Sequence, residues 1–116
     1  HLYRALARAG AELMCVPAAF TRQTGRAHWK TLLGARAIEC GAFIIAAAQG
    51  GLHEDGRETY GHSMIISPWG ETLAEARGDE PGIILADIDP ARAAKARRQI
   101  PNLALESAFE VINLEI

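Results

Sequence analysis

The sequence predicts a mixed α/β domain in which early helices alternate with strands and later strands pair in hairpins. Two observations lead to this fold class. Helical and apolar strand patterns follow one another through the first half of the chain, and turn signals separate short apolar runs in the second half. With 116 residues, of which 49% are hydrophobic, the chain is long enough for one core, so we expect a single domain.

The first two elements are a helix and a strand. The alanine-rich residues 2–9 predict a helix, because alanine has the highest helix propensity, and Gly10 ends it. Residues 12–16 are a short apolar run that stops at Pro17, and they predict a buried strand.

A second helix and strand follow a loop at residues 17–25. Residues 26–39 carry apolar side chains near 3.6-residue spacing, which predicts a helix with Thr24 as its N-cap and Gly41 as its end. The nearly all-apolar run 42–49 is typical of a strand that is covered on both faces.

The second half predicts paired strands and a last helix. The Asp55-Gly56 pair predicts a tight hairpin turn. Strands are expected at 62–67, 71–76 and 83–88, with a Pro-Trp-Gly turn between the first two. Asp89 followed by proline predicts the start of a helix that runs to residue 99, because aspartate caps a helix and proline suits its first turn.

Composition argues against several classes of partner. The net charge is −2 and no basic block occurs, so we expect neither nucleic acid nor a membrane surface as a partner. The apolar run at residues 42–48 is too short to span a bilayer. Cys15 and Cys40 form no CxxC or zinc-ligand spacing, the histidines are scattered, and no phosphate-loop pattern occurs. We therefore expect a cytoplasmic protein without a metal or other cofactor.

The loop after the first strand is the best candidate for a binding site. Ligands of open α/β sheets bind beyond the carboxyl ends of strands, and this loop places hydroxyl groups beside an aromatic ring there. Phe20, Thr21 and Thr24 are therefore candidate substrate-binding residues, and Gln49 is a fourth because it ends the next strand. An ordinary strand-to-helix connection is the alternative interpretation of this loop.

Several stretches, taken in order, resemble the nitrilase superfamily of carbon–nitrogen hydrolases. They cover nearly the whole chain up to Pro101 and are Arg4-Ala-Leu-Ala-Arg-Ala-Gly-Ala-Glu12, Val16-Pro-Ala-Ala-Phe-Thr21, Thr24-Gly-Arg-Ala-His-Trp29, Leu33-Gly-Ala-Arg-Ala-Ile-Glu39, Glu58-Thr-Tyr-Gly-His-Ser-Met-Ile-Ile-Ser-Pro-Trp-Gly70 and Ile84-Leu-Ala-Asp-Ile-Asp89. Within the superfamily, residues 53–63 most resemble the Nit-type amidases, which act on ω-amides of keto acids or on deaminated glutathione. Cys40-Gly41 departs from the family pattern, as does the tail at residues 104–110.

This resemblance implies half of a four-layer α-β-β-α sandwich, with residues 1–116 as the C-terminal part of one carbon–nitrogen hydrolase domain. It also implies a homo-oligomer, a small-molecule amide substrate and a Glu-Lys-Cys triad that forms a thioester with the substrate. All three triad residues are expected before His1, so we expect no catalytic residue in this chain and no activity from it alone. Two alternatives stay open: a non-catalytic binding or assembly module, and a member of a nitrilase or carbamoylase branch.

The thiols and histidines also have structural interpretations. Cys15 is expected to be a buried strand residue, and Cys40 lies at a helix end, where the helix dipole disfavours a thiolate. His28 is expected to pack in its helix, with pocket lining as the alternative. His62 is expected to be inward-facing and hydrogen-bonded.

Overall fold

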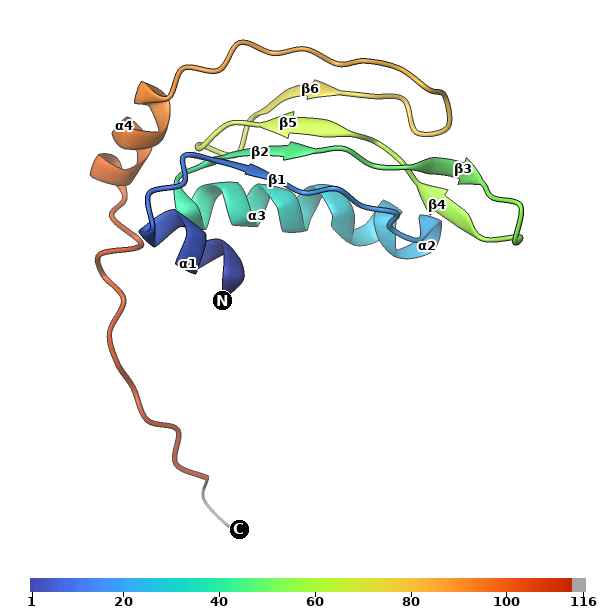
Figure 1. Cartoon of the computed structure of the whole chain (residues 1–116). Coiled ribbons are helices and arrows are strands. Elements are labelled where there is room, and N and C mark those ends of the chain that lie inside the picture. The colour runs from blue at the N-terminus through green and yellow to red at the C-terminus, as the bar shows by residue number, and fades with distance from the viewer. Residues whose placement is uncertain (114–116) are drawn as a thin grey trace.

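The computed structural model describes residues 1–113 and has the expected mixed α/β architecture (Figure 1). Its elements, in chain order, are α1 (Leu2–Arg8), β1 (Leu13–Cys15), α2 (Arg22–Thr24), the π-helical turn η1 (Gly25–Trp29), α3 (Lys30–Cys40), β2 (Phe43–Ala46), β3 (Gly50–Leu52), β4 (Glu58–Tyr60), β5 (Met64–Ile66), β6 (Thr72–Glu75) and α4 (Ala91–Gln99). No helix among residues 1–113 is long and apolar enough to cross a membrane.

The main sheet has four strands in the order β1-β2-β5-β6. The first pair, β1 and β2, is parallel, and the other two pairs are antiparallel. The parallel pair follows from the intervening helices, since parallel neighbours need a crossover connection. A separate two-stranded sheet, β3-β4, extends beyond the carboxyl end of β2. The prediction of a mixed α/β fold is therefore confirmed.

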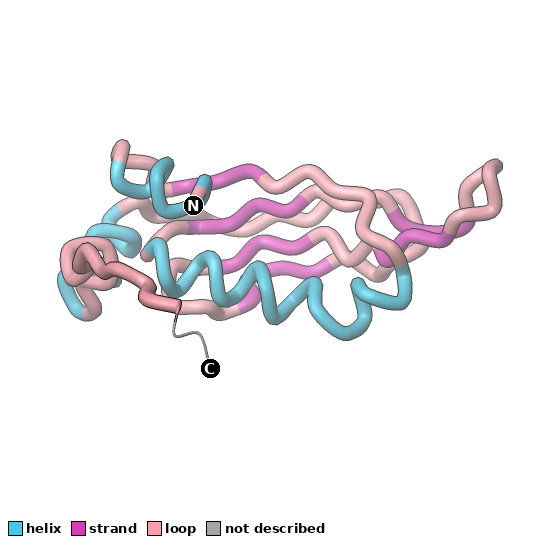
Figure 2. The backbone as a smooth tube through the Cα atoms, turned by 90° about the horizontal axis from the view of Figure 1, so that it is seen from below, coloured by secondary structure: helices cyan, strands magenta, loops and turns pink. Residues whose placement is uncertain are grey.

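The core lies between this sheet and α3, and α1 packs beside α3 (Figure 2). One stripe of the helical segment is buried, at Trp29, Leu33, Ala37 and Cys40. It packs against side chains on one face of the strands, among them Met14, Ile44, Ala46, Met64 and Ile66. The apolar residues Leu32 and Ile38 are instead 43% and 48% exposed, so only part of the predicted helical pattern faces the core.

The ends of two helices were predicted correctly. Gly41 ends α3 in the left-handed conformation, with φ 55°, where glycine is favoured. At α4 the Asp89 carboxylate accepts a hydrogen bond of 2.9 Å from the Ala91 amide. From α4, Arg97 donates hydrogen bonds to the carbonyl oxygens of Cys40 and Ala11, which ties this helix to the ends of α3 and α1.

The start of the second helix was predicted wrongly. Helical structure begins at Arg22 rather than residue 26, and Thr21, with φ −59° and ψ 143°, is the N-cap. Thr24 already has helical dihedral angles. The glycine at position 25 hid this start, because it suggested a loop. It is buried against Tyr60, and a Cβ at Gly25 would overlap the Tyr60 side chain. Tertiary packing therefore selects glycine here within a helical segment.

The predicted strand at 83–88 was also wrong. These residues form no ladder, and Ile83 and Leu85 are 89% and 84% exposed. Burial nevertheless alternates along this segment, with Ile84, Ala86 and Ile88 half-buried. In Figure 1 the chain from β6 to α4 passes on the side of the sheet opposite α3. The segment has a strand's side-chain pattern without a neighbouring strand among the described residues.

Two further differences concern the strands. Asp55-Gly56 does lie in a hairpin loop, where the His53 amide donates to the Arg57 carbonyl oxygen at 2.9 Å, but the flanking strands β3 and β4 were not predicted. Glycines at positions 50 and 51 masked β3. Cys15 was expected to be buried but is exposed, because Met14 is the only residue of β1 that packs in the core beneath the helical layer.

Candidate functional site

The candidate site lies where β1 and β2 end. Backbone pairing continues past both strands: Ala18 bridges Ala48 in parallel, and the Gln49 amide donates to the Ala18 carbonyl oxygen at 2.9 Å. The next residues pair with β4, since the Tyr60 amide donates to the Phe20 carbonyl oxygen at 2.8 Å. The structure thus brings the backbones of the two predicted binding segments together at one edge of the sheet, as expected for parallel strands.

The predicted side chains do not all converge. Phe20 is half-buried and its ring lies 5.3 Å from that of Trp29, measured between centroids. Thr21, the N-cap of α2, and Thr24, the last residue of α2, are both exposed, and their hydroxyl oxygens lie 2.5 Å apart. Their hydroxyl groups therefore hydrogen-bond to each other. Only Gln49, which is also exposed, borders the large cleft described next.

A cleft of about 560 Å³ opens beside Gln49. Its lining consists of Ala48, Gln49, Gly50, His53, His62, Ser63, Ala76, Gly78, Asp79, Glu80, Pro81 and Gly82. Two histidines and a serine in this set were not predicted as site residues. The signal that could have found them is the density of glycines at positions 50, 61, 78 and 82, because glycine permits close approach of backbone segments.

That close approach builds one wall of the cleft. A Cβ placed on Gly50 or on Gly61 would overlap the carbonyl oxygen of Gly78. Gly61 also has φ +65°, a conformation that other residues rarely adopt. The segment after β6 can therefore pack directly on the base of the β3-β4 hairpin.

The polar groups of the cleft are held by hydrogen bonds. The Ser63 hydroxyl accepts from the Ala48 amide at 2.9 Å and donates to the Ala48 carbonyl oxygen at 3.2 Å. The His53 Nε2 atom lies 2.6 Å from the hydroxyl oxygen of Thr59, which is buried. These bonds fix the walls, and no hydrogen bond within residues 1–113 occupies the side-chain carboxamide of Gln49, which is therefore available to a polar ligand.

His62 joins the cleft to the helical layer. It has φ 54°, unusual for a residue with a side chain, and its carbonyl oxygen accepts a bond of 2.9 Å from the Trp29 indole. Its Nδ1 atom lies 3.2 Å from Glu75, so His62 is hydrogen-bonded as expected. His28, expected to pack in its helix, is exposed instead.

Glu75 binds two partners. Partial burial raises the pKa of its carboxyl group, but hydrogen bonds from Lys30 and His62 outweigh this effect and hold the pKa below its usual 4.5. Lys30 Nζ lies 3.1 Å from the second carboxylate oxygen. Glu75 therefore links Lys30, at the start of α3, to His62, which borders the cleft.

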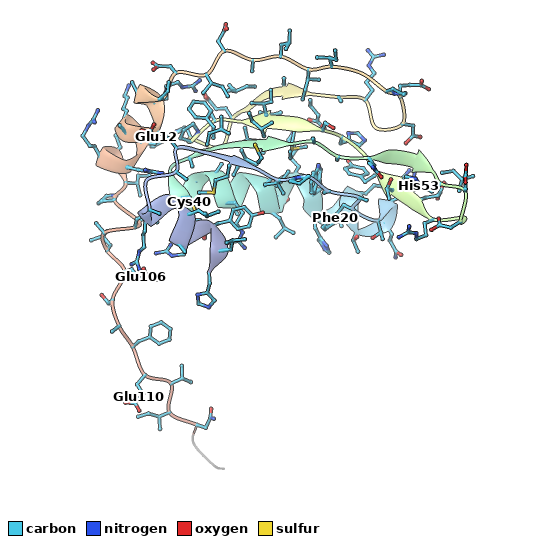
Figure 3. The ribbon with its side chains drawn as sticks, viewed as in Figure 1. Glu12, Phe20, Cys40, His53, Glu106 and Glu110 are labelled. Carbon is cyan, nitrogen blue, oxygen red and sulfur yellow. The ribbon has the colours of Figure 1, made fainter. Side chains whose placement is uncertain are left out.

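Neither thiol lines this cleft. Figure 3 places Cys40 at the end of the sheet near α1 and α4, whereas Phe20 and His53 lie at the opposite end. Burial, together with Glu39, raises the pKa of the Cys40 thiol and outweighs the nearby arginines. Among residues 1–113, no three His, Cys, Asp or Glu side chains are grouped as a metal site requires. The arrangement can bind a polar molecule, and it contains no activated thiol.

Comparison with known proteins agrees with this architecture. The model of the carbon–nitrogen hydrolase family matches residues 1–98. A deaminated glutathione amidase from Synechocystis is 53% identical over 102 residues, which is 88% of this chain and 37% of that protein. The human deaminated glutathione amidase is 48% identical over 97 residues, or 84% of this chain and 29% of that protein.

Solved structures give the same result. The NitFhit protein of C. elegans superposes with a TM-score of 0.81 at 39% identity, over 90% of this chain and 25% of that one. Nit3 of Saccharomyces cerevisiae, a member of branch 10 of the nitrilase superfamily, gives a TM-score of 0.79 at 33% identity, over 86% of this chain and 36% of that one. The chain belongs to the carbon–nitrogen hydrolase family. It spans about a third of the length of the curated relatives it matches.

Proposed function

We propose that this chain is the C-terminal, substrate-binding part of an amidase that hydrolyses small carboxylate-bearing amides. The observation that carries the proposal is the 53% identity to a deaminated glutathione amidase across residues that include the cleft. Within it, Gln49 borders the bound amide, and Phe20, Thr21 and Thr24 form the neighbouring edge of the substrate pocket. Phe20 and Gln49 follow the paired carboxyl ends of β1 and β2, and Thr21 and Thr24 lie at the two ends of α2 directly after Phe20, which supports this role.

The proposed reaction passes through a cysteine thioester. A cysteine thiol passes its proton to a glutamate as its sulfur attacks the amide carbon, and a lysine stabilises the tetrahedral oxyanion. The C–N bond then breaks, and the glutamate gives the proton to the leaving amine, so that a thioester remains. Water, deprotonated by the same glutamate, attacks the thioester and releases the acid and the free thiol. We assign none of these three roles to residues 1–113. Cys40 is buried away from the cleft with a raised pKa, which opposes thiolate formation, and Cys15 lies on an exposed strand face. Residues 1–113 then contribute binding, not bond cleavage.

The first experiment measures hydrolysis of glutaramate-type amides by the 116-residue chain and by its Cys40→Ala variant. We expect no turnover by either protein. Hydrolysis that Cys40→Ala abolishes would place the nucleophile in this chain and overturn the assignment.

A chimera tests whether the residues of this chain support amide hydrolysis when the catalytic residues are supplied by a relative. The matched residues of this chain replace the corresponding 102-residue segment of the Synechocystis amidase. We expect the chimera to hydrolyse deaminated glutathione, and a Gln49→Ala chimera to do so with a raised KM. A folded chimera that lacks activity, while the parent amidase retains it, would contradict an amidase role for this segment.

Assembly is part of the same proposal. We place a second sheet on the face opposite α3, as in a four-layer sandwich, and a second copy of the protein against the helical layer, in a cytoplasmic homo-oligomer. The exposed side chains Leu13 and Cys15 on β1 support the first contact. Leu6 on α1, with Leu32 and Ile38 on α3, supports the second, because each of these apolar side chains is 43–48% exposed on the helical layer. Two free thiols are consistent with a reducing compartment.

A non-catalytic assembly module is the second candidate, and the same exposed apolar residues favour it. Such a module would be monodisperse and would unfold cooperatively as the 116-residue chain, whereas part of a sandwich would aggregate through its open sheet. A nitrilase or carbamoylase is separated from an amidase by the substrate profile of the chimera.

A further inference from the structure

A second hollow, of about 300 Å³, borders the cleft. Its lining is Arg22, Arg26, Tyr60, His62, Arg77, Gly78, Asp79 and Glu80. His62 and residues 78–80 line both hollows, so the two are neighbours that share one wall. Three arginines from separate parts of the chain, namely α2, η1 and the segment after β6, therefore meet next to the candidate binding cleft.

The three arginines differ in whether they form ion pairs. Arg22 Nη2 lies 2.7 Å from Asp79 Oδ1, which anchors the segment after β6 to the start of α2. The Arg22 Nε atom is buried without a hydrogen-bond partner, and the nearest paired carboxylate oxygen, on Glu58, is 3.8 Å away. Within the part of the chain that the structure describes, Arg26 and Arg77 have no carboxylate oxygen at ion-pair distance. Glu80, in the same lining, likewise has no ion pair among residues 1–113. Two exposed guanidinium groups thus face one free carboxylate, which leaves a net positive charge for an anion.

The remaining wall suits a planar anion. The Tyr60 and His62 rings stack with centroids 4.0 Å apart and an interplanar angle of 19°. Guanidinium groups bind carboxylates through paired, charge-assisted hydrogen bonds and also lie flat on aromatic faces. A carboxylate that enters the hollow can contact Arg26 and Arg77 without separating Arg22 from Asp79.

We propose that this hollow is a carboxylate-binding subsite, which holds the end of the substrate remote from the scissile amide. This inference rests on the proposed function. It makes Arg26 and Arg77 specificity-determining residues, which select amides whose amine portion ends in a free carboxylate. Small neutral amides lack the group that the two arginines bind.

The test compares two probes that differ only in charge at the remote end: glutaryl-alanyl-glycine and its C-terminal carboxamide. The kinetics are measured with the chimera, which carries either the wild-type residues of this chain or the double substitution Arg26→Gln/Arg77→Gln. We expect a KM for the acid about tenfold below that for the carboxamide, the size of one charge-assisted hydrogen bond. In the double variant this ratio should fall to about one. Equal KM values for both probes in the wild type would overturn the proposal.

The control is Arg57→Gln. Arg57 lies in the β3-β4 hairpin loop, is paired with Asp55 at 2.6 Å, and borders neither hollow. This variant should keep the wild-type ratio, and loss of the ratio here would mean that net charge rather than the hollow selects the acid. If no protein turns over either probe, the proposed function fails. Calorimetric dissociation constants for the two probes then decide the subsite alone, by the same ratio.

Discussion

At the scale of single residues, Gly50 determines whether the wall of the cleft can form. A Cβ at this position would overlap the Gly78 carbonyl oxygen, and backbone cannot move aside as a flexible side chain can. We expect Gly50→Ala to lower the free energy of unfolding by about 1–3 kcal/mol, the usual cost of overpacking. Urea denaturation of the variant and the wild type measures this difference.

Gly34→Ala is the matched control for that prediction. Gly34 lies inside α3, and a Cβ there meets nothing within 4 Å. The same substitution should therefore raise the free energy of unfolding by about 0.5–1 kcal/mol, because alanine favours the helix. Equal effects of the two substitutions would refute the role assigned to the contact with Gly78.

The two thiols should differ sharply in reactivity. Cys15 is exposed and Cys40 is buried, so a thiol reagent at neutral pH should modify one thiol quickly, and Cys15→Ser should remove that fast phase. Burial and Glu39 hold the pKa of Cys40 above its usual 9.0 in the folded state. Its contribution to stability is therefore complete below pH 9 and is lost as the pH rises through the folded-state pKa. Rapid modification of Cys40 in the folded protein would contradict its burial.

At the scale of elements, Glu75 connects β6 to Lys30 at the start of α3 and to His62, which lies between β4 and β5. Its folded-state pKa lies below 4.5, so its contribution is present above pH 4.5 and is lost as the pH falls through the folded-state value. We expect Glu75→Gln to lower the free energy of unfolding at pH 7 by about 0.5–1 kcal/mol, with a difference that shrinks at lower pH. Glu54→Gln, in the exposed hairpin loop, should change neither quantity. A pH-independent loss would assign the effect to packing instead.

We expect the backbone pairing of residues 83–88 to differ between the 116-residue chain and the chimera. Its amides have no ladder partner within residues 1–113, so in the 116-residue chain they should exchange with deuterium much faster than those of β2. If a second sheet covers this face in the chimera, the alternating pattern of Ile84, Ala86 and Ile88 should place the segment in that sheet and protect its amides. Mass spectrometry of peptides from both proteins measures this, and fast exchange in both would argue against the four-layer sandwich.

At the scale of the whole molecule, the exposed apolar residues of the helical layer should control association. Leu6 is 43% exposed and Ile38 48% exposed, on α1 and α3 respectively. We expect the chimera to be oligomeric and Leu6→Asp/Ile38→Asp to reduce its mass by light scattering, because a buried unpaired carboxylate opposes the contact. Ala35→Asp, an exposed substitution on α3, tests whether any added charge does the same. An unchanged mass in the double variant would place the interface elsewhere.

The sequence predicted much of the fold because most elements depend on local patterns. The alanine content of residues 2–9 predicted α1, and Gly41 and Asp89 predicted the end of α3 and the start of α4 to within a few residues. The errors arose where distant contacts decide. Residue 25 is glycine because the Tyr60 side chain needs the space, not because the helix is interrupted there, and residues 83–88 have a strand pattern but no neighbouring strand among residues 1–113. Gln49 was found at the cleft from strand ends alone, whereas His53, His62 and residues 78–82 reach it only through the packing of glycines far apart in sequence.

The π-helical turn η1 determines the direction in which the residues before it face. A π-turn accommodates one residue more than an α-helix over the same length, so η1 differs from a regular α-helix by a single residue. Removing one residue from positions 25–29 would restore an unbroken α-helix and rotate everything before it by about 100° about the helix axis. Thr21 and Arg22 would then face a different direction, without any change in their own identity. At this edge of the sheet, insertion and deletion alter the surface presented to a ligand as effectively as substitution does.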